Sequence, residues 1–218
     1  MPYYFLFLLL MAGQGLAQSG LPDQNNNLTV GRIISTSGEV SITRADGSQG
    51  IAQRRADIHE GDSIQTGAEG FVQMRMIDSA QITLHCSSIM EIRSYLPFDS
   101  ASGIQLYLNQ GHLRTITGSH QGTYRLVTPV ALAGPLSSGS QTVYLVLQES
   151  DSSFLYGVFQ GNLSVMVDNN LFDMGTQPPL GFLRVRDDQT AEFVDSAFAN
   201  SVISRACPDS QYRLALPR

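Results

Sequence analysis

The chain has 218 residues and a formal net charge of −6, and all 13 of its basic residues are Arg. An acidic chain without a basic run argues against a nucleic-acid-binding surface. Without Lys, the chain can form neither a Schiff base nor a P-loop phosphate site. Because 42% of its residues are hydrophobic and only 15% are charged, it can bury a core. We therefore expect a soluble, extracytoplasmic β-protein.

The N-terminal sequence predicts an export signal. Residues 3–11 form an apolar run that is too short to span a membrane, which needs about 20 residues. Gly15 and Ala17 are the small residues that signal peptidase reads, so cleavage is expected after Ala17. Residues 1–17 are thus predicted to be a signal peptide of a periplasmic or secreted protein. No membrane span is expected after signal cleavage.

The mature chain is predicted to be all-β. Residues 18–29 are polar and turn-rich, which indicates a flexible N-terminus. From Val30 onward apolar and polar residues alternate, with turn residues between the runs. Strands are expected at 31–35, 38–43, 63–66, 71–77, 81–85, around Met90 and Ile92, and at 104–108, 112–117, 124–128, 143–147, 154–159, 163–167 and 182–186.

These short antiparallel strands predict a compact β-sandwich or a β-solenoid-like stack, covering residues 30–167. Residues 168–218 are expected to be a C-terminal extension with one short helix. That helix is predicted at 196–206, where Asp195 can cap it and Pro208 follows its end.

Two cysteines, Cys86 and Cys207, allow one disulfide bridge across 121 positions. An oxidising compartment would permit it. The alternative is that Cys86, which continues the alternation after Leu84, is a small buried hydrophobic residue. Sequence alone leaves both open, since it does not give the distance between the two Cα atoms.

Five turn motifs follow one another in a characteristic order. They are G-D-x-I-x-T-G at 61–67, an acidic turn at 78–79, L-x-L-x-x-G-x-L-R at 106–114, T-P-x-A at 128–131, and a strand–Gly–strand at 158–165. Together they resemble the FecR domain family over about residues 30–167. Ser79 stands where the family usually has Gly, which predicts a different turn type. An R-G-T triplet usual in the family is absent after the T-P-x-A motif.

The motif residues are predicted to shape turns rather than to bind a ligand. They are Gly61, Asp62, Thr66, Gly67, Asp78, Gly111, Pro129 and Gly161. Asp side chains accept hydrogen bonds from local backbone N–H groups, and Gly supplies positive φ. Positive φ is expected at Gly67, Gly111 and Gly161.

The resemblance implies a non-enzymatic periplasmic β-domain that works in signalling or envelope assembly. The best-known members carry a cytoplasmic anti-sigma segment and a transmembrane helix; this chain is expected to be the stand-alone exported kind, without direct sigma-factor control. Its predicted partner is an envelope protein. The alternative is a module that contacts carbohydrate or peptidoglycan, with Tyr95, Tyr107 or Tyr124 stacking on sugar rings.

No catalytic, metal or cofactor site is predicted. The histidines at 59, 85, 112 and 120 show no metal-binding spacing and are expected in exposed strands or loops. Ser137 and Ser138 lie outside any nucleophile-elbow context. The carboxylates Glu149, Asp151, Asp187 and Asp188 all fall in turn sequence and are expected to be solvated.

Overall fold

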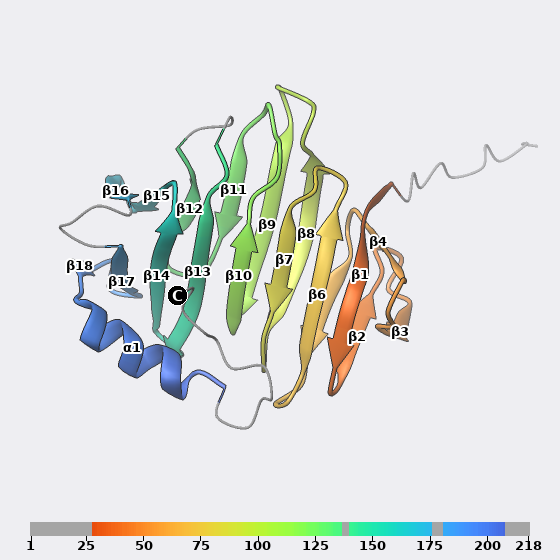
Figure 1. The fold of residues 1–218 in the computed structure, drawn as a ribbon, viewed down its shortest axis with the longest axis horizontal. Coiled ribbons are helices and arrows are strands. Elements are labelled where there is room, and N and C mark those ends of the chain that lie inside the picture. Colours follow the sequence, from red (N-terminus) through yellow and green to blue (C-terminus); the bar gives the residue numbers. More distant parts are fainter. Residues whose placement is uncertain (1–27, 137–139, 176–180, 208–218) are drawn as a thin grey trace, which may run out of the picture.

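The computed structural model describes residues 28–136, 140–175 and 181–207, and in these ranges the chain forms two nine-stranded sheets (Figure 1). The order in sheet A is β18-β17-β14-β13-β10-β7-β6-β1-β4, and in sheet B it is β16-β15-β12-β11-β9-β8-β5-β2-β3. The predicted all-β class is confirmed. Neighbouring strands are antiparallel except β9 and β11, which are parallel.

Sheet A consists of β1 (Thr29–Ser37), β4 (Asp57–His59), β6 (Phe71–Met76), β7 (Gln81–Leu84), β10 (His112–Ile116), β13 (Val143–Ser150), β14 (Ser153–Gln160), β17 (Phe182–Arg186) and β18 (Ala191–Phe193). Sheet B consists of β2 (Val40–Thr43), β3 (Gln49–Ile51), β5 (Ser63–Thr66), β8 (Ile89–Leu96), β9 (Gly103–Gln110), β11 (Tyr124–Val127), β12 (Leu132–Pro135), β15 (Asn162–Val167) and β16 (Asn170–Gly175).

The chain passes from one sheet to the other as it advances along the molecule. The hairpin β6–β7 lies in sheet A, β8–β9 in sheet B, β13–β14 in sheet A and β15–β16 in sheet B. The β-sandwich and the solenoid-like stack that the sequence predicted each describe part of the fold. The molecule has two stacked sheets, and the chain adds strands to both as it advances from one end to the other (Figure 1).

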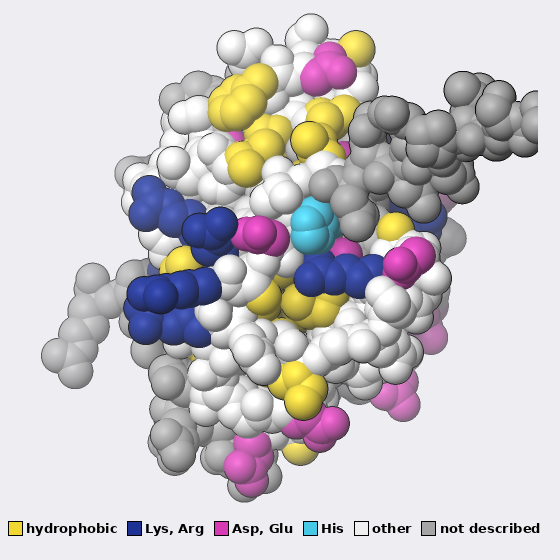
Figure 2. Space-filling model, turned by 90° about the vertical axis from the view of Figure 1, so that its right-hand side faces the viewer, with side chains coloured by type: hydrophobic (Ala, Val, Ile, Leu, Met, Phe, Trp, Pro, Cys, Tyr) yellow, Lys and Arg dark blue, Asp and Glu magenta, His cyan; other side chains and the backbone are white. Residues whose placement is uncertain are grey.

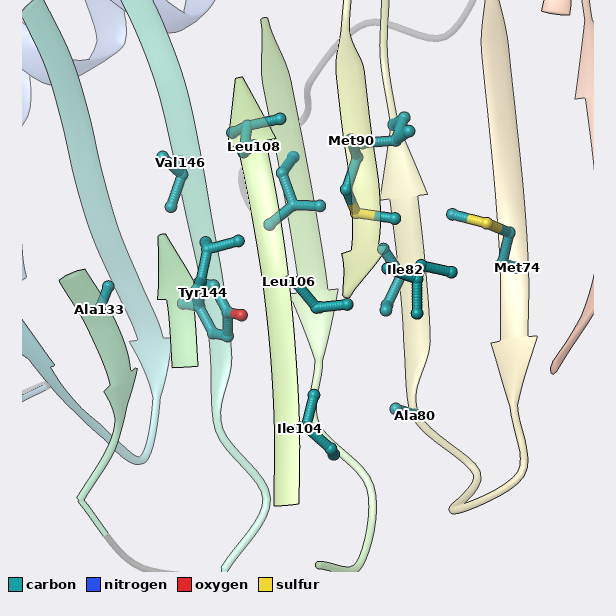
Figure 3. Close-up of a cluster of buried hydrophobic side chains, with 14 of the residues drawn as sticks. Met74, Ala80, Ile82, Met90, Ile104, Leu106, Leu108, Ala133, Tyr144 and Val146 are labelled. Carbon is teal, nitrogen blue, oxygen red and sulfur yellow. The ribbon is translucent and has the colours of Figure 1, made fainter. Parts of the chain in front are cut away.

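The core lies between the sheets (Figure 3). Alternation along each strand places every second side chain in it, as on β6, where Met74 is fully buried and Arg75 is exposed. Ile82 on β7, Leu106 on β9 and Tyr144 on β13 contribute from neighbouring strands and are also fully buried. Burying each such side chain stabilises the fold by about 1.5–3 kcal/mol.

A second apolar cluster lies on the outer face of sheet A. The helix α1 (Ser196–Arg205) packs Ala199, Val202 and Ile203 against Leu145, Leu147 and Leu155 of β13 and β14. This double burial explains why these two strands contain uninterrupted apolar runs instead of alternation. The predicted cap is confirmed: the Asp195 carboxylate accepts a hydrogen bond of 2.7 Å from the backbone N–H of Phe198.

Five short strands were missing from the predicted set, namely β3, β4, β12, β16 and β18. Of these, β16 pairs with β15, and β18 pairs with β17, so residues beyond 167 continue both sheets. Within the described ranges, no helix has the length and apolarity needed to span a membrane. The predicted signal peptide and residues 18–27 lie outside the described residues.

Candidate functional site

The G-D-x-I-x-T-G motif begins in the turn between β4 and β5 and continues through β5. Gly61 has a φ of +84°, and the Asp62 side chain is fully buried. Its Oδ2 accepts hydrogen bonds from Arg44 Nη1 at 2.5 Å and from the His59 backbone N–H at 2.8 Å. Arg44 Nη1 also lies 2.9 Å from His59 Nδ1. Asp62 therefore holds the turn and anchors Arg44, a residue that no sequence motif had singled out.

Thr66 and Gly67, at the end of the same motif, form hydrogen bonds to two other turns. Thr66 contacts the β7–β8 turn, and Gly67 contacts the β1–β2 turn. Thr66 Oγ1 donates to the carbonyl oxygen of His85 at 2.5 Å and accepts from the Ser88 backbone N–H at 2.9 Å. Gly67 lacks the expected positive φ, and a Cβ there would lie 3.2 Å from Glu39 Cβ. Its backbone N–H donates instead to the Glu39 carbonyl oxygen at 2.9 Å. The expectation for Gly67 was wrong because this glycine is the first residue of a turn, in which its carbonyl oxygen accepts a hydrogen bond from the Gly70 backbone N–H at 2.9 Å, and that position does not require positive φ.

The acidic turn keeps a glycine-like conformation without glycine. Ser79 has a φ of +71°, so serine occupies here the left-handed region that glycine adopts readily. Asp78 Oδ1 accepts hydrogen bonds from the Ala80 backbone N–H at 3.1 Å and from the Tyr95 hydroxyl at 2.8 Å. The second bond crosses from sheet A to sheet B, because Tyr95 lies on β8.

A buried cluster of tyrosines continues this polar contact. The Tyr144 hydroxyl donates to the Tyr124 hydroxyl at 3.1 Å, again between the two sheets. Burial raises the pKa of Tyr144 to about 12, and burial beside Asp78 also raises the pKa of Tyr95. These phenols thus stay neutral at ordinary pH and serve as hydrogen-bond donors inside the core.

The burial of these tyrosines corrects the sugar-stacking interpretation. Tyr95 is 0% exposed and Tyr124 is 6% exposed, so neither can present a ring face to a glycan. Tyr107 is partly exposed, but the Arg93 guanidinium lies over its ring, 5.2 Å from the centroid.

The remaining motif residues also shape the backbone. Gly111 and Gly161 have φ values of +91° and +75°, as expected. A Cβ at Gly111 would come within 2.3 Å of Ser88 Oγ. Pro129 lies at the β11–β12 turn, where Thr128 Oγ1 accepts a hydrogen bond from the Ala131 backbone N–H at 3.1 Å.

The structure joins Cys86 and Cys207 in a disulfide with a Cα–Cα distance of 5.8 Å. Cys86 lies on the turn between β7 and β8, and Cys207 follows the end of α1. The bridge therefore ties the helix to the middle of sheet A. Both cysteines are nearly fully buried. Cys86 is therefore bridged and is also the small buried residue that the sequence allowed.

A cavity of about 610 Å³ adjoins this bridge. Its lining comes from the β7–β8 turn, from β10, β13, β17 and α1, and from the residue after α1: Cys86, Ser87, His112, Gln148, Glu149, Ser150, Arg184, Val202, Arg205 and Ala206. Burial lowers the pKa of His112 from 6.5 to about 4, so its imidazole is neutral at physiological pH. Thiol-derived, imidazole, carboxylate and guanidinium groups, from Cys86, His112, Glu149 and Arg184 respectively, thus line one cavity.

Several predicted exposures were wrong here. His85, His112 and His120 are at most 9% exposed. His112 begins β10 and His85 follows β7, whereas His120 lies in the loop after β10, with its ring 5.5 Å from the Tyr124 ring. Glu149 lies at the end of β13 instead of in a solvated turn, and its Oε2 accepts from Arg184 Nε at 2.6 Å. Ser137 and Ser138 lie outside the described residues.

Comparisons with known proteins assign no family. No family model matches the chain, and no curated protein matches it. A solved cell surface anchoring domain is 24% identical over 29% of this chain and 83% of its own length, with a TM-score of 0.28.

Two crystal structures of a Parabacteroides distasonis protein assigned as an anti-sigma factor are 13% and 11% identical to the chain. They cover 66% of this chain, with TM-scores of 0.49 and 0.48. The chain in turn spans 65% and 64% of these two structures.

Proposed function

We propose that this chain is an exported FecR-type β-domain without enzymatic activity, and that it binds a protein partner in the bacterial envelope. The five ordered motifs support the family. Each described motif residue is engaged in turn geometry or buried hydrogen bonds, as a binding scaffold requires. The partner contact that we propose is strand addition at β3.

Edge strands decide where a partner strand can pair. In the part of the chain that the structure describes, the four edges are β3, β4, β16 and β18. Three of them carry an acidic residue, namely Asp57 on β4, Asp173 on β16 and Glu192 on β18. Charge on an edge discourages pairing with another chain. The sequence of β3, Gln-Gly-Ile, has no charge, and all three residues are exposed.

The backbone of β3 is oriented for such pairing. Ile42 pairs with Gly50, and the Ala52 N–H donates to the Val40 carbonyl oxygen at 2.9 Å. Because hydrogen-bonded pairs alternate along an antiparallel ladder, the backbone groups of Gln49 and Ile51 point away from β2. A partner strand would meet these groups and the Ile51 side chain, which is 80% exposed.

The surface around this edge also suits a protein. Figure 2 looks onto this end of the molecule and shows basic, acidic and histidine side chains across its middle, with hydrophobic side chains on either side. A groove of about 410 Å³ runs along β1 and β6 at the same end, beside the exposed Ile34 and Ile77. Mixed polar and apolar contacts of this kind are typical of protein–protein interfaces.

The uncharged, fully exposed β3 edge is the observation that carries the proposal. To test it, a photo-crosslinking amino acid is placed at Gln49 in the full chain, expressed in the bacterial envelope, with the exposed Asp151 in the β13–β14 turn as the control position. We expect an adduct with one protein from position 49 and none from position 151. Ile51→Pro should abolish the adduct, because proline removes an outward N–H donor, whereas Ile51→Val should keep it.

Thermal melting of both Ile51 variants provides the control for folding. An adduct that Ile51→Pro leaves unchanged, or the absence of any protein adduct at position 49, would count against strand addition. Retention of the purified chain on protein-free sacculi would instead favour the glycan-contacting alternative.

A further inference from the structure

The disulfide lies beside a third side chain that can bind metal. One ligand atom from each of Cys86, Cys207 and His112 lies within 4.8 Å of the others, and all three residues are buried. Within the described residues, no other three His, Cys, Asp or Glu side chains form such a group. The Nδ1 atom of His112 is buried and has no hydrogen-bond partner. Because buried polar atoms are normally paired, this unpartnered nitrogen indicates a ligand.

We propose that reduction of the disulfide turns this group into a binding site for a thiophilic divalent ion such as Zn²⁺. A dithiol donates two electrons and two protons: it is oxidised to its own disulfide, while the Cys86–Cys207 bond breaks to give two thiols. The ion then displaces both thiol protons and is bound by two thiolates and the His112 imidazole. In the oxidised chain the sulfur atoms are bonded to each other, so the site opens only on reduction.

The framework holds two of the three ligands in place. Ser88 Oγ donates to the Cys86 carbonyl oxygen at 3.0 Å and accepts from the His112 backbone N–H at 2.7 Å. One side chain thus fixes the backbones of both ligands. Cys207 lies beyond the end of α1, where a small displacement of the chain can separate the sulfurs.

The required separation is small. Tetrahedral Zn²⁺ takes sulfur at about 2.3 Å and nitrogen at about 2.0–2.1 Å, which places ligand atoms roughly 3.5–3.8 Å apart. The three ligand atoms already lie within 4.8 Å of one another.

Cys86 and His112 both line the cavity of about 610 Å³, so a fourth ligand can reach the ion from this cavity. Glu149 lines the same cavity, but its Oε2 accepts hydrogen bonds from Arg184 Nε at 2.6 Å and from Ser153 Oγ at 3.0 Å. The carboxylate is therefore occupied, and water from the cavity takes the fourth position. Three protein ligands with one open position differ from the four protein ligands that close structural zinc sites.

The test uses Co²⁺ as the probe and the full mature chain, reduced without oxygen by a phosphine, because a dithiol would itself bind the metal. We expect the reduced chain to bind one Co²⁺ and to develop the visible bands of tetrahedral cobalt and a thiolate charge-transfer band. The oxidised chain should show neither. His112→Gln should weaken binding about tenfold or more and shift the visible bands, whereas His120→Gln, at a buried histidine outside the group, should change neither.

Circular dichroism of the oxidised variants checks that each one folds. The proposal fails if the reduced wild-type chain develops no tetrahedral spectrum, including the case in which reduction unfolds it. It also fails if reduced, folded His112→Gln binds Co²⁺ with the affinity and spectrum of the wild type.

Discussion

The two ends of the sandwich differ in how far their strands are covered by the rest of the chain. At one end, α1 covers the outer face of β13 and β14, and the Cys86–Cys207 bridge ties the helix to the sheet. At the other end, β3 is fully exposed and pairs with β2 alone among the described strands. The same two-sheet architecture thus supports a locked region, in which the outer face is also a core, and an open region, in which backbone groups remain available for a partner.

The largest expected effect is the loss of the bridge at the locked end. Replacing both Cys86 and Cys207 by Ser frees a loop of about 120 residues in the unfolded chain, which should lower the free energy of unfolding by about 4–5 kcal/mol in the entropy model. Denaturant unfolding of the oxidised wild type and the double variant measures it. A change below about 1 kcal/mol would show that the bridge does not lock this end.

Truncation beneath the helix should be nearly as costly. Leu147 is fully buried in the cluster that α1 covers, so Leu147→Ala should lower the free energy of unfolding by about 2–5 kcal/mol. The matched control is Ile51→Ala at the open end, where the side chain is 80% exposed and the loss should stay within about 0.5 kcal/mol. Equal losses at the two sites would contradict the contrast between the ends.

Acid should weaken the locked end through His112. Its pKa is about 4 in the folded chain, compared with 6.5 unperturbed, because burial disfavours the imidazolium. The unfolded state therefore binds the proton first, so this stabilisation is complete above about pH 6.5 and is lost as the pH falls toward 4. The loss should be about 3 kcal/mol. Unfolding midpoints measured between pH 7 and 4 test this, and His112→Gln should flatten the slope that they show.

The smallest effect is expected at the acidic turn between the two ends. Ser79 has a φ of +71°, a conformation that costs an L-residue about 1–2 kcal/mol. Ser79→Gly relieves this strain but adds freedom to the unfolded chain, so the net gain should be up to about 1 kcal/mol. Thermal melting measures the gain, and Ser100→Gly outside any strand is a reference for the entropy cost alone. A lower midpoint for Ser79→Gly would indicate that the serine hydroxyl stabilises the turn.

The strands that sequence predicted best are those with a strong side-chain pattern. Alternation located β6 and β7, and runs rich in β-branched and aromatic residues between turn residues located β13 and β14. The strands β3 and β12 were missed because Gln49-Gly50-Ile51 has no buried side and Leu132–Pro135 contains both Gly and Pro. Such strands form because neighbouring strands offer hydrogen bonds, which is tertiary information.

The contacts of the candidate site were even harder to predict from sequence, because they depend on which strands become neighbours in the fold. The backbone role of Asp62 followed from local turn chemistry, but its contact with Arg44 joins residues 18 positions apart. His112 shows no metal-ligand spacing in sequence, and it meets Cys86 and Cys207 only because β10 pairs with β7 and α1 folds back over the sheet. A histidine at the start of a strand and a cysteine at a turn are unremarkable until the strand order is known.

Amide hydrogen exchange of the oxidised full chain tests the contrast between the two ends most directly. The Ile51 amide on β3 should exchange freely, because its N–H has no partner among the described residues. The Leu147 amide, paired within the covered region, should exchange at least about 1,000-fold more slowly and only with global unfolding. Protection of the Ile51 amide equal to that of Leu147 would contradict an open edge at β3 and, with it, the proposed binding mode.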